Sequence, residues 1–266
     1  MIMRPVAMAA WVAALAAIPI WQGGCWGNQP AQELSALRPS SLGYSRQLVL
    51  VVSDSWQADS AHLQCYARTT AGQPWRGVGQ GVPVSIGRSG LAWGRGLHGD
   101  PPLAGPVKRE GDGKAPAGVF ELSRAFGYAA PQQEIQGVKL PYLHLTADLV
   151  GVDDAKSKYY NQIVRPDEVP SKDWDSAETM RRDDGLYEWG VAVNHNTSPA
   201  LPGAGSCIFL HVWRGPGKPT AGCTAMSKED MVRLLGWLDP QSKPLLVQLP
   251  QEAYRRLAGP WGLPPG

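Results

Sequence analysis

The stretch "HVWRGPGKPTAGCTAMSKED" (211–230) places His211 at the end of an apolar run and Cys223 twelve positions later. The glycines and prolines between them favour a tight irregular loop over a strand or a helix. Ser227 and Asp230 have the spacing of a reciprocal helix cap, and apolar residues then recur on one helical face. The stretch therefore predicts a strand end, a loop and a helix over 227–238.

The run "CIFLHVW" (207–213), which leads into this stretch, has the alternation of a β-strand. One face would carry Ile208, Leu210 and Val212, and the other Cys207, Phe209, His211 and Trp213. The sequence thus places His211 near the end of a strand, on a face shared with aromatic rings and a cysteine.

Further strands are predicted wherever short apolar runs are bounded by turn residues. These runs cover 47–54, 61–68, 81–94, 119–122, 140–146, 189–196 and 243–250. Only 227–238 has a clear helical pattern, and strands and helices do not alternate as in a doubly wound fold. The pattern predicts a mainly β domain.

The ends of the chain are predicted to lie outside that domain. Residues 1–25 have the basic start and the short apolar run, 6–20, of an export signal. The small residues before Cys25 leave lipid attachment, ordinary cleavage and an uncleaved anchor all open. We expect a linker at 26–45 and a C-terminal tail at 253–266.

Between these ends, 46–252 is predicted to form one folded domain. It contains an insertion at about 147–189, which is polar and has little periodicity. A stretch of this length without clear structure is usually functional, such as a lid, or an insertion.

Composition limits the kind of protein. The chain has 266 residues, 43% of them hydrophobic, and a formal net charge of +2 with acids and bases interspersed. It can bury a sizeable core, and it lacks the concentrated basic face that nucleic acids require. The high Trp count, 11, offers aromatic surface for lining a groove.

Cysteine parity points to one unpaired thiol. If Cys25 is removed or lipidated, three cysteines remain, and at most one disulfide can form within the chain. At Cys223, a nearby helix start and a neighbouring imidazole would both lower the pKa of the thiol. A thiolate attacks carbonyl carbon, and backbone N–H groups around Gly222 and Thr224 could hold the oxyanion.

Two other interpretations of the same residues stay open at this point. Cys223 could form a structural disulfide with Cys207, beside a packed histidine. A zinc site could instead be built from His195, His211, Cys207 and Cys223, although their spacing matches no standard zinc pattern.

Three blocks in order resemble the L,D-transpeptidase catalytic family, the cysteine enzymes that rebuild bacterial peptidoglycan. They are "PVSIGRSGLAWG" (83–94), "KREGDGKAPAGVF" (108–120) and "FLHVW…TAGCTAM" (209–226). The resemblance implies a β-sandwich with a few helices, one of them after the catalytic cysteine. It also implies that no metal or organic cofactor is needed.

By the same resemblance, Cys223 is the nucleophile and His211 its base, with a backbone carbonyl orienting the imidazole. The reaction implied is L,D-transpeptidation of peptidoglycan tetrapeptide stems through a thioester acyl-enzyme, in cell-wall biogenesis. The expected location is the periplasm or cell envelope, with a membrane anchor at Cys25 as one option.

The motif departs from the family pattern at two positions. Ala221 replaces the usual second histidine and Ala225 the usual arginine. Arg214 or Lys218 could supply a replacement cation. The altered site leaves open a peptidase or amidase that uses the same pair, and a non-catalytic wall-binding protein.

Several other residues are weaker candidates for contact with substrate. Thr220 and Trp213 flank the pair, and the turn residues Asn194 and His195 could line the groove. In the insertion, Tyr159, Tyr160 and Trp174 could cover a bound stem or simply pack. Cys65 and Cys207 could form the one disulfide.

Overall fold

The computed structural model describes residues 31–130 and 137–265. Its helices are α1 (Ala31–Ala36), α2 (Ser41–Tyr44), α3 (Lys228–Trp237) and α4 (Gln251–Trp261), with a 3-10 turn at Pro240–Ser242. The strands before the insertion are β1 (Gln47–Ser53), β2 (Ser60–Ala67), β3 (Arg76–Ser85), β4 (Leu91–Trp93), β5 (Ala115–Gly127) and β6 (Tyr142–His144). The later strands are β7 (Val150–Val152), β8 (Ile163–Val164), β9 (Ala177–Thr179), β10 (Trp189–Val193), β11 (Phe209–Val212), β12 (Thr224–Met226) and β13 (Leu245–Pro250).

The main sheet closes on itself. Its strands follow the order β10-β11-β12-β3-β2-β1-β13-β5, and β5 then pairs back with β10. The mainly β prediction is confirmed, and the two faces of the expected sandwich belong to this one closed circuit. The long strand β5 makes closure possible, because Gly118–Glu121 pair with β13 and Leu122–Gly127 with β10.

Strand alternation divides the molecule into two cores, as predicted for 207–213. Ile208 and Leu210 lie in the large core inside the main sheet. Phe209 and Cys223 lie in a smaller cluster on the other face, together with Met180 and Tyr187 of the insertion. The insertion therefore covers the face of β11 that carries His211.

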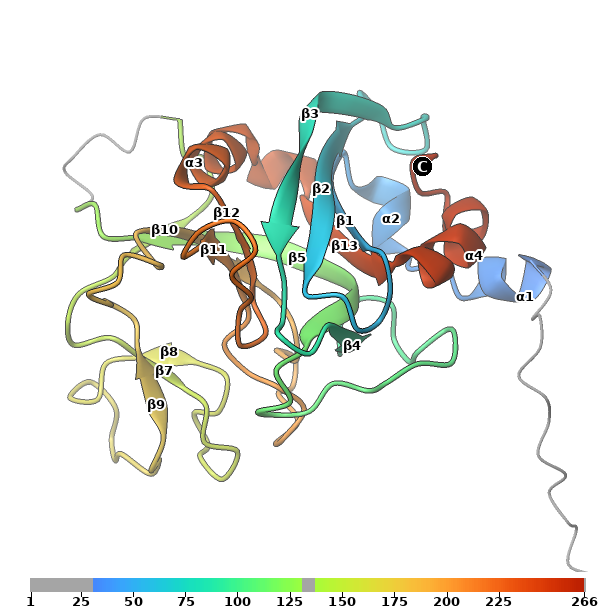
Figure 1. Cartoon of the computed structure of the whole chain (residues 1–266). Coiled ribbons are helices and arrows are strands. Elements are labelled where there is room, and N and C mark those ends of the chain that lie inside the picture. The colour runs from blue at the N-terminus through green and yellow to red at the C-terminus, as the bar shows by residue number, and fades with distance from the viewer. Residues whose placement is uncertain (1–30, 131–136, 266) are drawn as a thin grey trace, which may run out of the picture.

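The insertion has structure that its sequence did not reveal. Strands β8, β7 and β9 form a separate three-stranded sheet, which lies at the lower left of Figure 1. Asn161 fastens this unit to the main domain, because its Nδ2 donates to the carbonyls of His195 and Asn196 and its Oδ1 accepts from the Cys207 N–H.

The helix after the cysteine forms as predicted. The Asp230 N–H donates to Ser227 Oγ at 3.1 Å, and the Ser227 hydroxyl donates to Asp230 Oδ2 at 2.6 Å. This reciprocal cap begins α3, which buries Met231, Leu234 and Leu235.

The predicted tail at 253–266 and linker at 26–45 are wrong over their described parts. Helix α4 buries Tyr254, Leu257 and Trp261, and α1 packs beside it with Leu34 buried (Figure 1). Helix α1 has only six residues, and α4 contains Pro260, which is unfavourable inside a helix, so neither has a clear sequence pattern. Both gain stability from packing rather than from propensity. The predicted signal, 1–25, lies outside the described residues.

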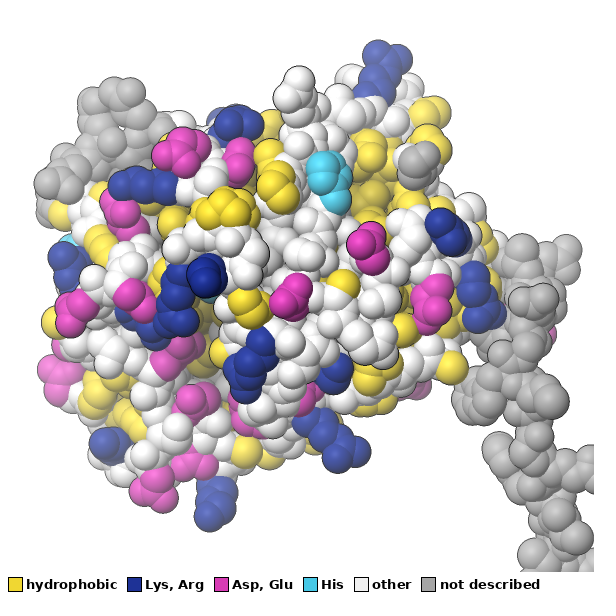
Figure 2. All heavy atoms as spheres, in the orientation of Figure 1, with side chains coloured by type: hydrophobic (Ala, Val, Ile, Leu, Met, Phe, Trp, Pro, Cys, Tyr) yellow, Lys and Arg dark blue, Asp and Glu magenta, His cyan; other side chains and the backbone are white. Residues whose placement is uncertain are grey.

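The surface carries both charges. Figure 2 shows acidic and basic side chains interspersed over the face that is drawn. Within residues 31–130 and 137–265, no helix combines the length and apolar character needed to cross a bilayer.

Candidate active site

His211 is held at the centre of a small aromatic cluster. It pairs with Gly190 of β10 on one side and Ala225 of β12 on the other, and its side chain is 5% exposed. The ring of Tyr187 packs edge-on against the imidazole, with centroids 5.2 Å apart.

The tautomer of His211 is set by its own neighbour. Nδ1 lies 2.7 Å from the Val212 carbonyl oxygen, so Nδ1 carries the proton and donates it there. Nε2 is then the lone-pair nitrogen, as a general base requires.

Cys223 begins the turn into β12, and its thiol is held by backbone groups. Sγ accepts from the Phe209 N–H at 3.3 Å and donates to the Cys207 carbonyl at 3.6 Å. The thiol is therefore fixed beside Phe209, and His211 lies two residues further along the same strand face, about 6 to 7 Å away along the backbone.

One cavity of about 300 Å³ brings the two side chains together. Cys223 also lines a second cavity of about 240 Å³ on its other side. Residues common to both cavities are Arg88, Glu178, Tyr187, Ala221 and Cys223. Cys223, the candidate nucleophile, thus lies between these two cavities.

The resting pair is neutral, which contradicts the expected low thiol pKa. Burial raises the pKa of the Cys223 thiol to about 12 and lowers that of the His211 imidazole to about 4. The three residues of β12 separate Cys223 from the start of α3, so the helix amides do not act directly on the sulfur. The site therefore holds no preformed thiolate in this state, and the thiol must lose its proton before it can attack.

The turn before Cys223 is braced from within. Thr220 Oγ1 donates to the Cys223 carbonyl at 2.6 Å and accepts from the Gly222 N–H at 3.1 Å. Because it is already engaged, the Gly222 N–H is not free for an oxyanion in this conformation. The backbone of Thr224 belongs to the ladder between β11 and β12, where Thr224 pairs with Leu210, and Thr224 lines neither cavity.

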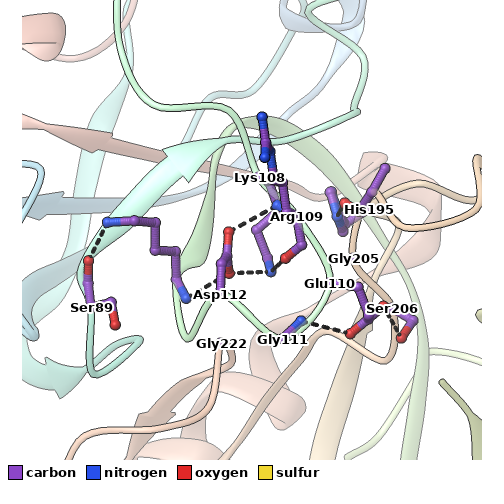
Figure 3. A network of polar contacts seen from close by, with 12 residues as sticks. Ser89, Lys108, Arg109, Glu110, Gly111, Asp112, His195, Gly205, Ser206 and Gly222 are labelled. Carbon is purple, nitrogen blue, oxygen red and sulfur yellow. Dashed lines mark hydrogen bonds and ion pairs between the residues drawn. The ribbon is translucent and has the colours of Figure 1, made fainter.

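The glycine-rich block at 108–114 supports this turn from outside (Figure 3). Asp112 accepts from Lys108 Nζ at 2.7 Å and from two backbone N–H groups of the same loop. Glu110 accepts from the Ser206 hydroxyl at 2.7 Å. A Cβ at Gly222 would lie 3.0 Å from the Lys114 carbonyl oxygen, so glycine permits the loop to pack against the turn.

The predicted substrate-contact residues divide into two groups. Thr220, Trp213 and Arg214 line the 300 Å³ cavity, as does Lys218. Ala221 and Ala225, which replace the usual histidine and arginine, line it too.

Asn194 and His195 do not lie at this site, contrary to expectation. His195 is 1% exposed, with Nδ1 accepting from the Arg95 N–H and Nε2 contacting the Ala204 carbonyl. Asn194 bonds Ser123 and Glu121 and lines other cavities. Both follow the end of β10, which carries them to the opposite end of the strand from Gly190 and His211.

The three aromatic residues of the insertion that could have covered a bound stem, Tyr159, Tyr160 and Trp174, serve packing. Tyr159 and Trp174 form an edge-on pair at 5.6 Å, and the Tyr160 hydroxyl bonds Glu110 and the Gly205 N–H. None of the three lines either cavity that contains Cys223.

The structure also tests the two other interpretations of Cys223, a disulfide and a zinc site. Cys65, Cys207 and Cys223 are free thiols, so neither disulfide considered forms among these three. Over the described ranges, no cluster of three or more His, Cys, Asp or Glu side chains is arranged to hold a metal, so the four-residue zinc site is not assembled.

Among the charged or polar residues that line the 300 Å³ cavity, Arg88, Glu178, Arg182 and Tyr187 were not predicted from the sequence. Arg88 lies in the quoted "GRSG" block, whereas Glu178, Arg182 and Tyr187 lie in the insertion. Only the charge of Arg88 within a recognised block could have drawn attention to it. The other three depend on how the insertion folds over β11.

Comparison with known proteins assigns the chain to a family. The family model for the L,D-transpeptidase catalytic domain (YkuD) matches residues 68–247, which include His211, Cys223 and the insertion. Comparisons with curated proteins and with solved structures give no match. Members of the matched family are cysteine transpeptidases that act on the peptide stems of peptidoglycan. The chain belongs to the L,D-transpeptidase catalytic domain family.

Proposed function

We propose that this protein is an exported L,D-transpeptidase that joins peptidoglycan stem peptides, with Cys223 as nucleophile and His211 as base. The observation that carries the proposal is the shared cavity, in which a buried thiol and an imidazole with its Nε2 lone pair line one wall.

The chemistry follows from the protonation states. As a tetrapeptide donor binds, Nε2 of His211 takes the thiol proton and Sγ attacks the carbonyl carbon of the L,D bond. The imidazolium returns the proton to the leaving amine of the terminal D-residue, and a thioester remains on Cys223. An amine of a second stem then takes the acyl group.

Basic side chains around the cavity favour the binding of a donor peptide that carries a carboxylate. Arg182 and Arg214 both approach Asp184, at 2.6 and 3.5 Å. Arg88 and Lys218 have no acidic partner in the part of the chain that the structure describes. A donor carboxylate in the space beside Ala221 and Ala225 would meet these two unpaired cations, which compensates for the missing arginine of the motif.

Hydrolysis is the second candidate, because the same pair would pass the acyl group to water if no amine bound. Its supporting observation is the replacement of motif side chains by Ala221 and Ala225, which leaves room for water beside the thiol. A wall-binding protein without activity is the third interpretation, and the experiment below separates all three.

The deciding experiment incubates the purified protein with tetrapeptide muropeptides and identifies products by mass spectrometry, with Cys223→Ala as the control. Cross-linked dimers indicate a transferase and shortened stems alone indicate a hydrolase. If wild type and Cys223→Ala give the same unchanged stems, the enzymatic proposal is wrong.

Export belongs to the same proposal, because peptidoglycan lies outside the cytoplasm. Its support is the basic start and apolar run of residues 1–25. Fractionation of cells, with and without Cys25→Ala, would test both the export and the lipid anchor.

A further inference from the structure

Glu178 brings a carboxyl group from the insertion to the catalytic thiol. It lies on β9, is partly buried, and lines both cavities that meet at Cys223. No other carboxylate of the described residues lines both cavities.

The Glu178 carboxyl is held by a hydrogen bond but can still accept others. Oε2 accepts from the Tyr187 hydroxyl at 2.9 Å, and the Cys207 thiol lies close to the same carboxyl group. An ionised carboxylate has about four lone-pair sites, so these two contacts leave capacity for a ligand. Tyr187 also packs edge-on against His211, so one tyrosine contacts both the carboxyl and the imidazole.

The surroundings of Glu178 suit a group that exchanges protons near neutrality. Burial raises the pKa of its carboxyl to about 7. The titratable and charged groups that face it or share its cavities are Tyr187, Arg182, Asp153, Cys207, Cys223, His211, Arg88, Lys108, Glu110, Arg214 and Lys218. Of these, Arg182 favours the ionised carboxylate and Asp153 opposes it.

We propose that Glu178 is a catalytic residue of the second half-reaction, in which its carboxylate takes the proton from the acceptor ammonium at the thioester. The inference rests on the proposed function, because it needs an acyl group on Cys223.

The step balances without any further reagent. The acceptor enters as R–NH₃⁺, which has no lone pair for attack, and gives one proton to the carboxylate of Glu178. The resulting amine forms a C–N bond to the thioester carbon, and the C–S bond breaks. The second nitrogen proton passes through His211 to the departing thiolate, which regenerates the thiol. Glu178 then releases its proton to solvent.

The test separates the two half-reactions. Full-length protein is first acylated with a tetrapeptide donor, and intact mass measures acyl-enzyme formation. A second tetrapeptide stem is then added as acceptor, and the decay of the acyl-enzyme is followed. Glu178→Gln should acylate at close to the wild-type rate, whereas its transfer rate should fall about 100-fold or more.

A matched control lies in the same insertion. Glu168 is an exposed carboxylate that forms an ion pair with Arg165 and lines neither cavity. Glu168→Gln removes the same charge and should transfer like wild type. Equal losses in the two variants would overturn the proposal.

Two readouts exclude a purely structural role. The wild-type transfer rate should rise with pH on a limb near about 7, and Glu178→Gln should lose that limb. Added formate should restore part of the transfer rate of Glu178→Ala, because it supplies the missing carboxylate. An unchanged limb in Glu178→Gln, or no response to formate, counts against Glu178 as the proton acceptor.

A second variant covers the case in which changes at Glu178 unfold the insertion. Tyr187→Phe keeps the ring against His211 but removes the hydroxyl that anchors the carboxyl. It should slow transfer more than acylation, and the opposite order would contradict the inference. If the wild type forms no acyl-enzyme, the proposed function fails. If it does, and Glu178→Gln transfers normally, only the inference about Glu178 fails.

Discussion

The Cys223 thiol points at the backbone carbonyl of Cys207, with Sγ and O 3.6 Å apart. This contact directs the thiol proton to a backbone carbonyl, while Nε2 of His211 keeps its lone pair. The thiol and the imidazole thus line one cavity, and each is held by a backbone carbonyl.

Alkylation of Cys223 should be slow near neutral pH. Because burial raises the pKa of this thiol to about 12, the reactive thiolate is scarce until strongly basic pH. The rate with iodoacetamide, read by intact mass, should keep rising with pH and should be below that of a free cysteine at neutrality. Cys223→Ala gives the background from Cys65 and Cys207. A plateau at or below neutral pH would contradict the resting state described.

Replacing the base should abolish acylation without unfolding the protein. In His211→Asn the amide can still donate to the Val212 carbonyl, but the Nε2 lone pair is gone. We expect acyl-enzyme formation to fall by about 10² to 10⁴. The thermal midpoint should stay close to that of wild type. Retained acylation would remove His211 from the mechanism.

Stability should fall as the pH drops below neutral. Burial lowers the pKa of His98, His195 and His211 to about 4. Since the unfolded chain takes up these protons near pH 6.5, it binds more protons than the folded chain between about 6.5 and 4. Each histidine then lowers the free energy of unfolding by up to about 1.4 kcal/mol for each pH unit toward acid. Glu178 has the opposite effect because burial raises its pKa to about 7, but it is one group against three histidines.

Urea unfolding across this pH range measures the effect. The free energy of unfolding should decline toward acid, and His98→Gln should reduce the slope because the variant lacks one of the three imidazoles. An unfolding free energy that is flat from neutrality to pH 4 would show that these imidazoles are not buried in the neutral form.

The C-terminal helix should be essential for stability. Trp261 is fully buried, and truncation of so large a core side chain costs about 3 to 5 kcal/mol. Trp261→Ala should lower the urea midpoint strongly, and Trp261→Phe much less. Val232→Ala, at a side chain that is 45% exposed on α3, is the control and should change stability little. Similar midpoints for Trp261→Ala and the control would mean that α4 does not belong to the core.

The predictable parts of this fold were those in which the local pattern matches the period of the element. Phe209 and Leu210 alternate as a strand must, and Ser227 with Asp230 has the spacing of a cap, so β11 and α3 could be placed. The parallel pairing of β1 with β13 brings together segments far apart in the chain, which no local pattern encodes.

The limits of sequence reasoning at the site have a similar cause. His211 and Cys223 were identified from strand alternation and resemblance, and their shared cavity requires only neighbouring strands. Glu178 could not be found, because its place depends on the small sheet that lies over β11. The thiol pKa was predicted in the wrong direction for the same reason, since the insertion supplies part of the burial.

Helices α1 and α4, at the two ends of the described chain, lie together and so determine where neighbouring segments join the domain. Helix α1 begins at Ala31 on the side of the molecule opposite the three-stranded sheet (Figure 1). A segment that precedes α1 therefore joins the domain at the end opposite the three-stranded sheet. A partner that bound α1 and α4 would leave that sheet uncovered.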